Sequence, residues 1–197
     1  MRYSILFCLL LPLSIFAQKR PVDYVNPFIG TGGHGHTFPG ATVPFGMVQL
    51  SPDTRTDGWD AAGGYHYSDS TILGFSHTHL NGTGVNDLCD VLITPSVSGS
   101  FEPLKFQHKN EIAKAGYYKV KLDKGYEVDL TSSDRVGFHR YKFDKSVKTV
   151  YFNINLNKRN ELIESRIFPK GNDKIEGSMV SKSWASARHL SFVAQFS

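Results

Sequence analysis

Two His-x-His pairs, His34/His36 and His77/His79, are the residues of this sequence best suited to chemistry. Neutral imidazoles are common zinc ligands, so the pairs raise the hypothesis of a zinc hydrolase. A polar loop histidine more often hydrogen-bonds to the backbone or to a substrate, and we therefore assign no metal ligand here. The carboxylates that would complete such a zinc site are those of Asp87 and Asp90.

Trp59 and Asp60 form a second set, of a kind that suits sugar binding. Trp59 follows Gly58 in a loop-like stretch. An indole face stacks on the C–H surface of a sugar ring, and a neighbouring carboxylate accepts bonds from vicinal hydroxyls. The alternative is a tryptophan that pins the loop to the core while Asp57 forms an Asx turn. These residues alone leave both interpretations open.

A glycine-rich loop contains the pattern Gly-x-Gly-x-x-Gly at Gly30, Gly32 and Gly35. A dinucleotide site would need a helix that opens at the last glycine, and Pro39 and Gly40 prevent that helix. No Gly-Lys-Ser/Thr follows, so a phosphate-binding loop is excluded as well. The loop therefore calls for another interpretation.

The elements that must position these residues are predicted to be β-strands. Apolar and polar residues alternate along several segments, as in half-buried strands, and turn residues separate them at sandwich-like spacing. No alternation of strands and helices appears. We expect an all-β, antiparallel β-sandwich with strands near 47–51, 72–76, 90–94, 117–122, 127–131, 136–143, 150–156, 174–181 and 189–196.

Composition limits the classes of protein. The 197 residues are 40% hydrophobic and 20% charged, which suits one folded domain. The net charge of +4 is spread along the chain without a run of five like charges. We therefore expect no nucleic-acid partner and no basic membrane-binding arm.

The first 17 residues have the layout of a secretory signal peptide. Arg2 precedes an apolar run over 5–11, and the polar residues 18–20 follow Ala17, where we place the cleavage. The run is far shorter than the roughly 20 residues of a membrane-spanning helix. We expect a secreted or periplasmic protein without a membrane span. Cleavage would leave Cys89 as its single cysteine, so no internal disulfide is expected.

Several ordered blocks of residues 18–197 resemble the N-terminal β-sandwich domain of glycoside hydrolase family 92. The resemblance covers nearly all of the predicted mature chain, which makes it more specific than a single glycine motif. The blocks are 25–32 (VNPFIGTG), 38–41 (FPGA), 44–53 (PFGMVQLSPD), 64–67 (GYHY), 74–80 (GFSHTHL), 82–84 (GTG), 116–118 (GYY), 136–141 (VGFHRY) and 181–185 (SKSWA).

The resemblance implies an exo-acting, inverting α-mannosidase, with α-1,2-linked mannose of N-glycans or mannan as the expected substrate. Family members pack this sandwich on an α/α toroid that carries the catalytic acid and base and a calcium ion. We therefore expect both carboxylates and the calcium in a missing C-terminal catalytic domain, and we assign no catalytic residue here. Because the apolar strand at 189–196 ends at the chain end, we expect a truncated sandwich that is inactive by itself.

By the same resemblance, N-terminal loops reach the sugar, and Trp59 is the first candidate for contacting it. One departure concerns Cys89, which stands where the family shows a glycine. We therefore expect no positive-φ turn there. A stand-alone carbohydrate-binding sandwich is the alternative function, with the zinc hydrolase as a further one. The candidate substrate-binding residues are Trp59, Asp60, Gly32, Gly33, His34, His36, His77 and His79.

Overall fold

The computed structural model describes residues 19–157 and 159–197, and within them the chain is almost entirely β-structure. The expected signal peptide, 1–17, lies outside this range. Two short 3-10 helices, η1 (Pro21–Tyr24) and η2 (Trp59–Ala61), interrupt the strands. In the described part of the chain, no helix has the length and apolar character needed to span a membrane.

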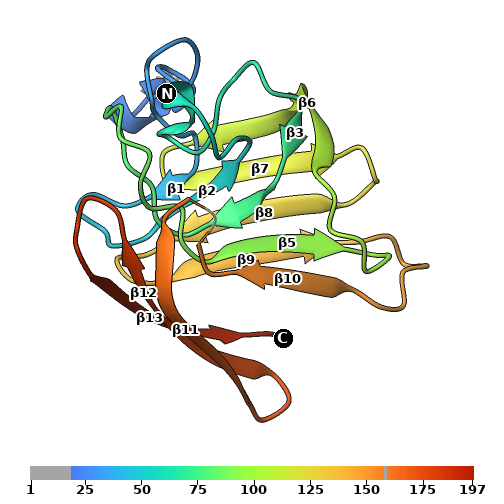
Figure 1. Cartoon of the computed structure of the whole chain (residues 1–197). Helices are drawn as coiled ribbons and strands as arrows, with labels where there is room; N and C mark the ends of the chain where they lie inside the picture. The colour runs from blue at the N-terminus through green and yellow to red at the C-terminus, as the bar shows by residue number, and fades with distance from the viewer. Residues whose placement is uncertain (1–18, 158) are drawn as a thin grey trace, which may run out of the picture.

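Two five-stranded sheets form the body of the molecule (Figure 1). Every strand pair in them is antiparallel. The first sheet has the order β1-β2-β4-β5-β10 and the second β3-β6-β7-β8-β9. The first contains β1 (Ala41–Thr42), β2 (Gln49–Asp53), β4 (Gly74–Ser76), β5 (Leu92–Ser96) and β10 (Tyr151–Asn155). The second contains β3 (Thr71–Ile72), β6 (Leu104–Lys114), β7 (Tyr117–Leu122), β8 (Glu127–Ser132) and β9 (Gly137–Lys142).

The hydrophobic core lies between these sheets. Leu50 of β2 and Phe75 of β4 pack from one side, and Tyr118 of β7 and Val128 of β8 pack from the other. All four are fully buried. The alternation read from the sequence is present in β7, where every second residue is more buried than its neighbours. Burial also alternates in β9, but there the apolar Phe138 is exposed and His139 is on the more buried side. The expected antiparallel β-sandwich is thus confirmed.

A separate three-stranded sheet, β11-β12-β13, extends away from the stacked pair (Figure 1). β12 (Lys174–Lys182) and β13 (Arg188–Gln195) agree with the sequence prediction, whereas β11 (Glu161–Lys170) was not predicted. Every residue of β11 is exposed. Because neither of its faces is buried, its sequence shows no alternation of apolar and polar residues.

β6 was also missed, for a different reason. The strand changes register between Phe106 and Glu111, which is an irregularity of the β-bulge kind. Beyond the bulge, the polar Glu111 faces the core and Ile112 is exposed. In the second half of the strand, a polar residue thus lies on the buried face and an apolar residue on the exposed face, so the sequence pattern does not predict the strand.

Backbone conformation corrects one expectation at Cys89. Leu88, Cys89 and Val91 have φ angles of 65°, 58° and 55°, so the left-handed turn is present without glycine. Such conformations are strained for residues with a Cβ, most of all for β-branched valine. Tertiary bonds hold the segment in place: the Cys89 amide donates to the Thr78 carbonyl at 2.8 Å, and the Val91 amide to the Leu156 carbonyl at 2.9 Å.

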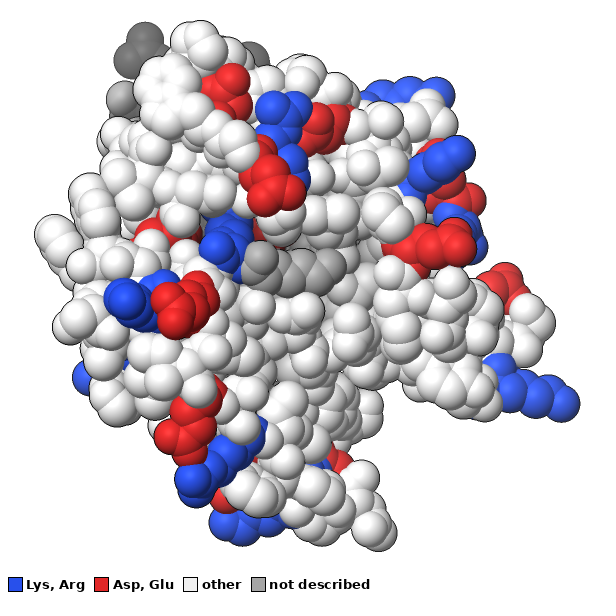
Figure 2. Space-filling view, viewed as in Figure 1, with Lys and Arg blue, Asp and Glu red and all other residues white. Residues whose placement is uncertain are grey.

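Charged side chains are interspersed on the surface. On the face shown in Figure 2, basic and acidic groups neighbour one another and are separated by uncharged areas. Exposed pairs of opposite charge include Arg166 with Glu164 and Lys170 with Glu176, each at 2.6 Å. Pairs of this kind contribute little to stability, because water screens them.

Candidate functional site

Glycines shape the loop that carries the first histidine pair. Gly30 has φ 82°, and a Cβ on Gly35 would lie 2.1 Å from the Gly30 carbonyl oxygen, so only glycine permits this approach. The Thr37 amide closes the loop by donating to the same carbonyl at 3.3 Å. Gly33 has φ 55° and its carbonyl accepts a bond from His66 at 3.1 Å. The loop is therefore a compact unit.

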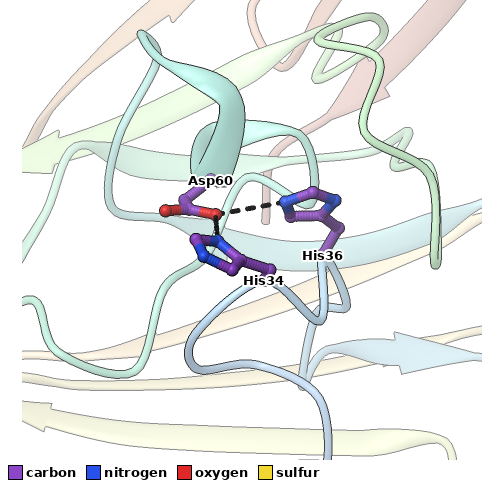
Figure 3. A group of neighbouring side chains, drawn as sticks. All are labelled: His34, His36 and Asp60. Carbon is purple, nitrogen blue, oxygen red and sulfur yellow. Dashed lines mark hydrogen bonds and ion pairs between the residues drawn. The ribbon is translucent and has the colours of Figure 1, made fainter.

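His34 and His36 converge on one carboxylate oxygen (Figure 3). His34 Nδ1 lies 2.7 Å and His36 Nε2 lies 3.2 Å from Oδ1 of Asp60 in η2. His34 is exposed and His36 is buried. The bond from His34, followed by that from His36, holds the pKa of the Asp60 carboxyl below its usual value. Asp60 is thus a fixed anion that orients both imidazoles.

Trp59 lies beside this cluster and remains open to solvent. Its ring is centred 4.9 Å from that of His34 and 4.5 Å from that of His36, with the latter contact edge-to-face. A Cβ on Gly84 would lie 2.1 Å from the indole Nε1, so the Gly84 backbone fixes the ring from another direction. The residue is nevertheless 58% exposed. The structure thus holds a large aromatic surface in place without covering it.

Because the contact between Gly84 and Trp59 is so close, we expect Gly84→Ala to displace the indole. A Trp184→Phe background leaves Trp59 as the only tryptophan of the chain. There, Gly84→Ala should shift the fluorescence emission and change its quenching by acrylamide. Gly32→Ala is the matched control, since its nearest contact would be an ordinary 3.7 Å to Tyr67. Unchanged emission in Gly84→Ala would contradict this positioning role.

The second histidine pair takes no part in the bonds that join His34, His36 and Asp60. His79 is buried, and its Nδ1 and Nε2 lie 2.7 Å from the Gln49 carbonyl and 2.9 Å from Asp53 Oδ1. His77 is half-buried, with Nδ1 2.8 Å from the Val91 carbonyl and Nε2 3.0 Å from Nε2 of His139. Burial lowers the pKa of His77 below its ordinary value. Both side chains therefore connect parts of the fold.

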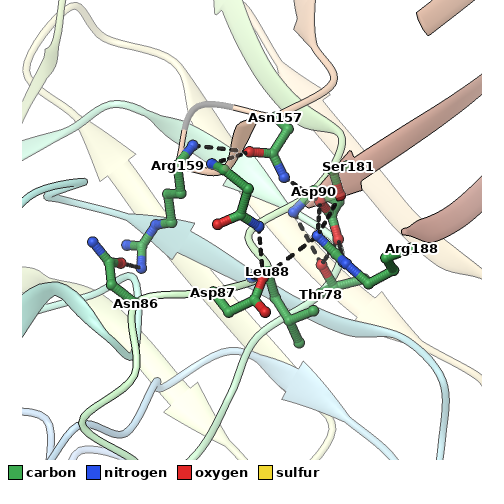
Figure 4. A network of polar contacts seen from close by, with 10 residues as sticks. Thr78, Asn86, Asp87, Leu88, Asp90, Asn157, Arg159, Ser181 and Arg188 are labelled. Atoms are coloured by element: carbon green, nitrogen blue, oxygen red, sulfur yellow. Dashed lines mark hydrogen bonds and ion pairs between the residues drawn. The ribbon is translucent and has the colours of Figure 1, made fainter. Parts of the chain in front are cut away.

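Asp87 and Asp90 belong to a polar network rather than to a histidine site (Figure 4). Asp90 is fully buried and accepts bonds from Thr78 Oγ1 at 2.8 Å and from Asn157 Nδ2 at 2.6 Å. It also accepts from the guanidinium of Arg188, whose Nη2 is 3.0 Å from Asp90 Oδ1. The Asp87 carboxylate accepts a bond from Asn160 at 2.5 Å. This geometry does not support a zinc hydrolase built from the histidine pairs with these aspartates.

The sequence indicated four residues that the structure does bring together, namely Trp59, Asp60, His34 and His36. Gly84 was missed as a positioning residue, although it lies in the Gly-Thr-Gly block of the family resemblance. Nothing local signals its role, because its contact with Trp59 spans two loops.

Comparison with known proteins identifies the family. Residues 24–197 match the glycosyl hydrolase family 92 N-terminal domain. A family GH92 α-mannosidase from Bacteroides thetaiotaomicron, solved in complex with mannoimidazole, is 37% identical and superimposes on 88% of this chain with a TM-score of 0.81. An inverting GH92 mannosidase from the same organism shares the fold, with 23% identity over 90% of this chain and a TM-score of 0.67.

A curated relative, an uncharacterized secreted glycosidase from Arthroderma benhamiae, is 28% identical over 158 residues, which is 73% of this chain. The matched region is only a part of each relative: 25% of the mannoimidazole-bound enzyme, 29% of the inverting mannosidase and 20% of the fungal protein. The chain belongs to glycosyl hydrolase family 92, whose N-terminal domain it forms from residue 24 to residue 197.

Proposed function

We propose that this chain is the sugar-contacting part of a secreted, exo-acting, inverting α-mannosidase that removes α-1,2-linked mannose from N-glycans or mannan. The observation that carries the proposal is the exposed indole of Trp59, held by two imidazoles and the Gly84 backbone. The relative with 37% identity, described as an α-mannosidase bound to mannoimidazole, supports a mannose-like ligand. The signal-peptide layout of residues 1–17 supports export.

In this proposal Trp59 stacks on the apolar face of a mannose ring, and Asp60 accepts a hydrogen bond from a hydroxyl group of that ring. Both histidine bonds use Oδ1 of Asp60, and within residues 19–157 and 159–197 no hydrogen bond reaches Oδ2, which we assign to the sugar. His34 is exposed, and in this proposal its Nε2 edge lies next to the mannose ring. The loop and η2 thus offer a stacking surface with polar groups at its rim.

Inverting hydrolysis requires an acid and a base roughly 6.5–9.5 Å apart, one to protonate the leaving oxygen and one to activate water. We propose that both come from the C-terminal domain that the family resemblance implies. Calcium prefers six to eight oxygen ligands. The cluster at Trp59 offers two imidazoles and one carboxylate, so it does not fit that ion. We therefore place calcium in the C-terminal domain and derive no step through it here.

Trp59→Ala tests the proposal. We expect it to weaken binding of methyl α-mannoside by about tenfold or more, because the stacking surface is removed. Trp184→Ala is the matched control, since Trp184 is the other tryptophan and is 75% exposed. Titration calorimetry or ligand-observed NMR on the purified chain measures both.

Equal binding by wild type and Trp59→Ala would overturn the assignment of Trp59. Release of mannose from an aryl α-mannoside by this chain alone would contradict the placement of the acid and base elsewhere. Tight mannose binding without any hydrolysis in the presence of a catalytic domain would instead favour the alternative, a carbohydrate-binding sandwich.

A further inference from the structure

A second cluster of ligating side chains lies buried inside the fold. Asp53, His79 and Cys89 each present one donor atom, and these three atoms lie within 4.8 Å of one another. Ser76 adds a hydroxyl oxygen 3.1 Å from His79 Nε2. All four residues are buried. The cluster therefore combines a carboxylate, an imidazole, a thiol and a hydroxyl out of contact with bulk water.

The orientation of His79 is that of a metal ligand. Its Nδ1 lies 2.7 Å from the backbone carbonyl of Gln49, a bond in which the ring nitrogen must be the donor. Metal-bound histidines are typically oriented by such a bond from the second nitrogen. Nε2 then faces Asp53 Oδ1 at 2.9 Å. A neutral ring that carries its proton on Nδ1 has an acceptor at Nε2, and the Asp53 oxygen is an acceptor too. A proton or a metal ion must therefore lie between these two atoms.

Cys89 is held in this position against backbone strain. Its φ of 58° is unfavourable for a residue with a Cβ, and Leu88 and Val91 on either side share that strain. Strained backbone of this kind concentrates at ligand-binding and catalytic sites. Burial, reinforced by the charge of Asp53, raises the pKa of the Cys89 thiol, so the site in its metal-free form holds a neutral thiol.

We propose that Asp53, His79 and Cys89 bind a zinc ion inside the sandwich, with Ser76 or a water molecule as the fourth ligand. Ligands at zinc distances of about 2.0–2.3 Å in tetrahedral geometry lie roughly 3.3–3.6 Å apart. The observed 2.9 Å and 3.1 Å separations therefore widen by a few tenths of an ångström. Zinc replaces the proton that lies between His79 Nε2 and Asp53 Oδ1 and the thiol proton of Cys89, so two protons leave as one dication enters.

The position of the site gives it a structural role. Asp53 ends β2, Ser76 ends β4, and Cys89 belongs to the strained segment that leads into β5. The zinc ion would join these three parts. Cys89 is the only cysteine in the part of the chain that the structure describes, so no disulfide secures this region.

Cobalt provides a direct test, because Co²⁺ takes zinc sites and gives a near-ultraviolet charge-transfer band when a thiolate binds it. Cys8→Ser leaves Cys89 as the only thiol of the full chain. We expect this protein to bind one Co²⁺ with that band and to release it to Zn²⁺. Zinc should also raise its melting temperature, since a ligand that binds only the folded state stabilises it. Absence of the band would overturn the proposal whatever the variants do.

Cys89→Gly in the same background separates metal binding from folding. Glycine accepts φ 58° without strain, so this variant should stay folded. We expect it to lose the cobalt band and to bind Zn²⁺ about a hundredfold more weakly or worse. His34→Ala in the exposed cluster should leave both properties unchanged. Zinc affinity that survives Cys89→Gly, or that is lost in His34→Ala, would assign the metal elsewhere.

Discussion

Asp90→Ala is expected to lower the free energy of unfolding by about 3–5 kcal/mol, the range measured when one partner of a buried ion pair is removed. Asp90 is fully buried and accepts bonds from Thr78, Asn157 and Arg188. Without this carboxylate the guanidinium of Arg188 remains partly buried with no full counter-charge. Asp87 Oδ1, 3.6 Å from Arg188 Nη2, compensates only in part.

The loss of stability should be largest in the three-stranded sheet, which Arg188 ties to the sandwich. Arg188 begins β13 and also donates to Ser181 of β12 at 3.1 Å, so its bond to Asp90 ties the three-stranded sheet to the sandwich. Urea unfolding measures the total loss, and hydrogen exchange of the β12 amides shows whether that sheet opens first. Glu127→Ala is the control, because the partly exposed Lys119–Glu127 pair should contribute under about 1 kcal/mol. Similar losses in both variants would contradict the buried-pair argument.

The sequence predicts the strands whose two faces differ. β7 alternates in burial, and its sequence alternates in the same way. In β8, by contrast, Val128, Asp129 and Leu130 are all buried, and in β9 the more buried side is that of His139 and Tyr141, with Phe138 exposed. β11 fails this test because both faces are exposed, and β6 fails because a bulge turns Glu111 inward. Periodicity reports burial and not strand conformation itself, so strands with unusual burial are missed.

The same limit applies to the candidate site. Trp59 and Asp60 are neighbours in the sequence, and their residue types alone indicate a sugar-binding surface. That His34 and His36 reach Asp60 depends on a loop closed by Gly30 and Thr37, which only the fold shows.

His77 and His79 have the same His-x-His spacing as the first pair, yet each enters a different environment. Those environments are set by tertiary partners, namely His139 for His77 and Asp53 for His79. The backbone at Cys89 is also set by tertiary contacts. Its left-handed φ contradicts the preference of the residue and is imposed by neighbouring segments. Short-range patterns therefore predict residue types for a site better than they predict which residues meet.

Glu111→Leu is expected to lower the free energy of unfolding by about 3 kcal/mol. The carboxylate accepts hydrogen bonds from the hydroxyls of Tyr65 and Tyr118, each at 2.7 Å, in the core. Burial, with Glu111 adding to it, raises the pKa of both phenols, so both hydroxyls keep their protons and must donate. A buried donor left without an acceptor costs about 1–3 kcal/mol. Urea denaturation compared with Glu111→Gln, which keeps one acceptor oxygen and should lose less, measures the effect.

The two tyrosines should respond differently, and this distinguishes hydrogen bonding from lost packing. His108 Nδ1, which donates to Glu111 Oε1 at 2.5 Å in the wild type, is free in Glu111→Leu to accept from Tyr65, 3.4 Å away. Tyr118 has no second acceptor among the residues that the structure describes. Adding Tyr118→Phe to Glu111→Leu should therefore restore more stability than adding Tyr65→Phe, because replacing both partners of a buried bond by apolar groups is nearly neutral. Equal rescue, or none, would show that Glu111 stabilises the core through the shape of the β6 bulge. In that case the bulge would place the carboxylate in the core, and the hydrogen bonds of the carboxylate would not be what maintains the bulge.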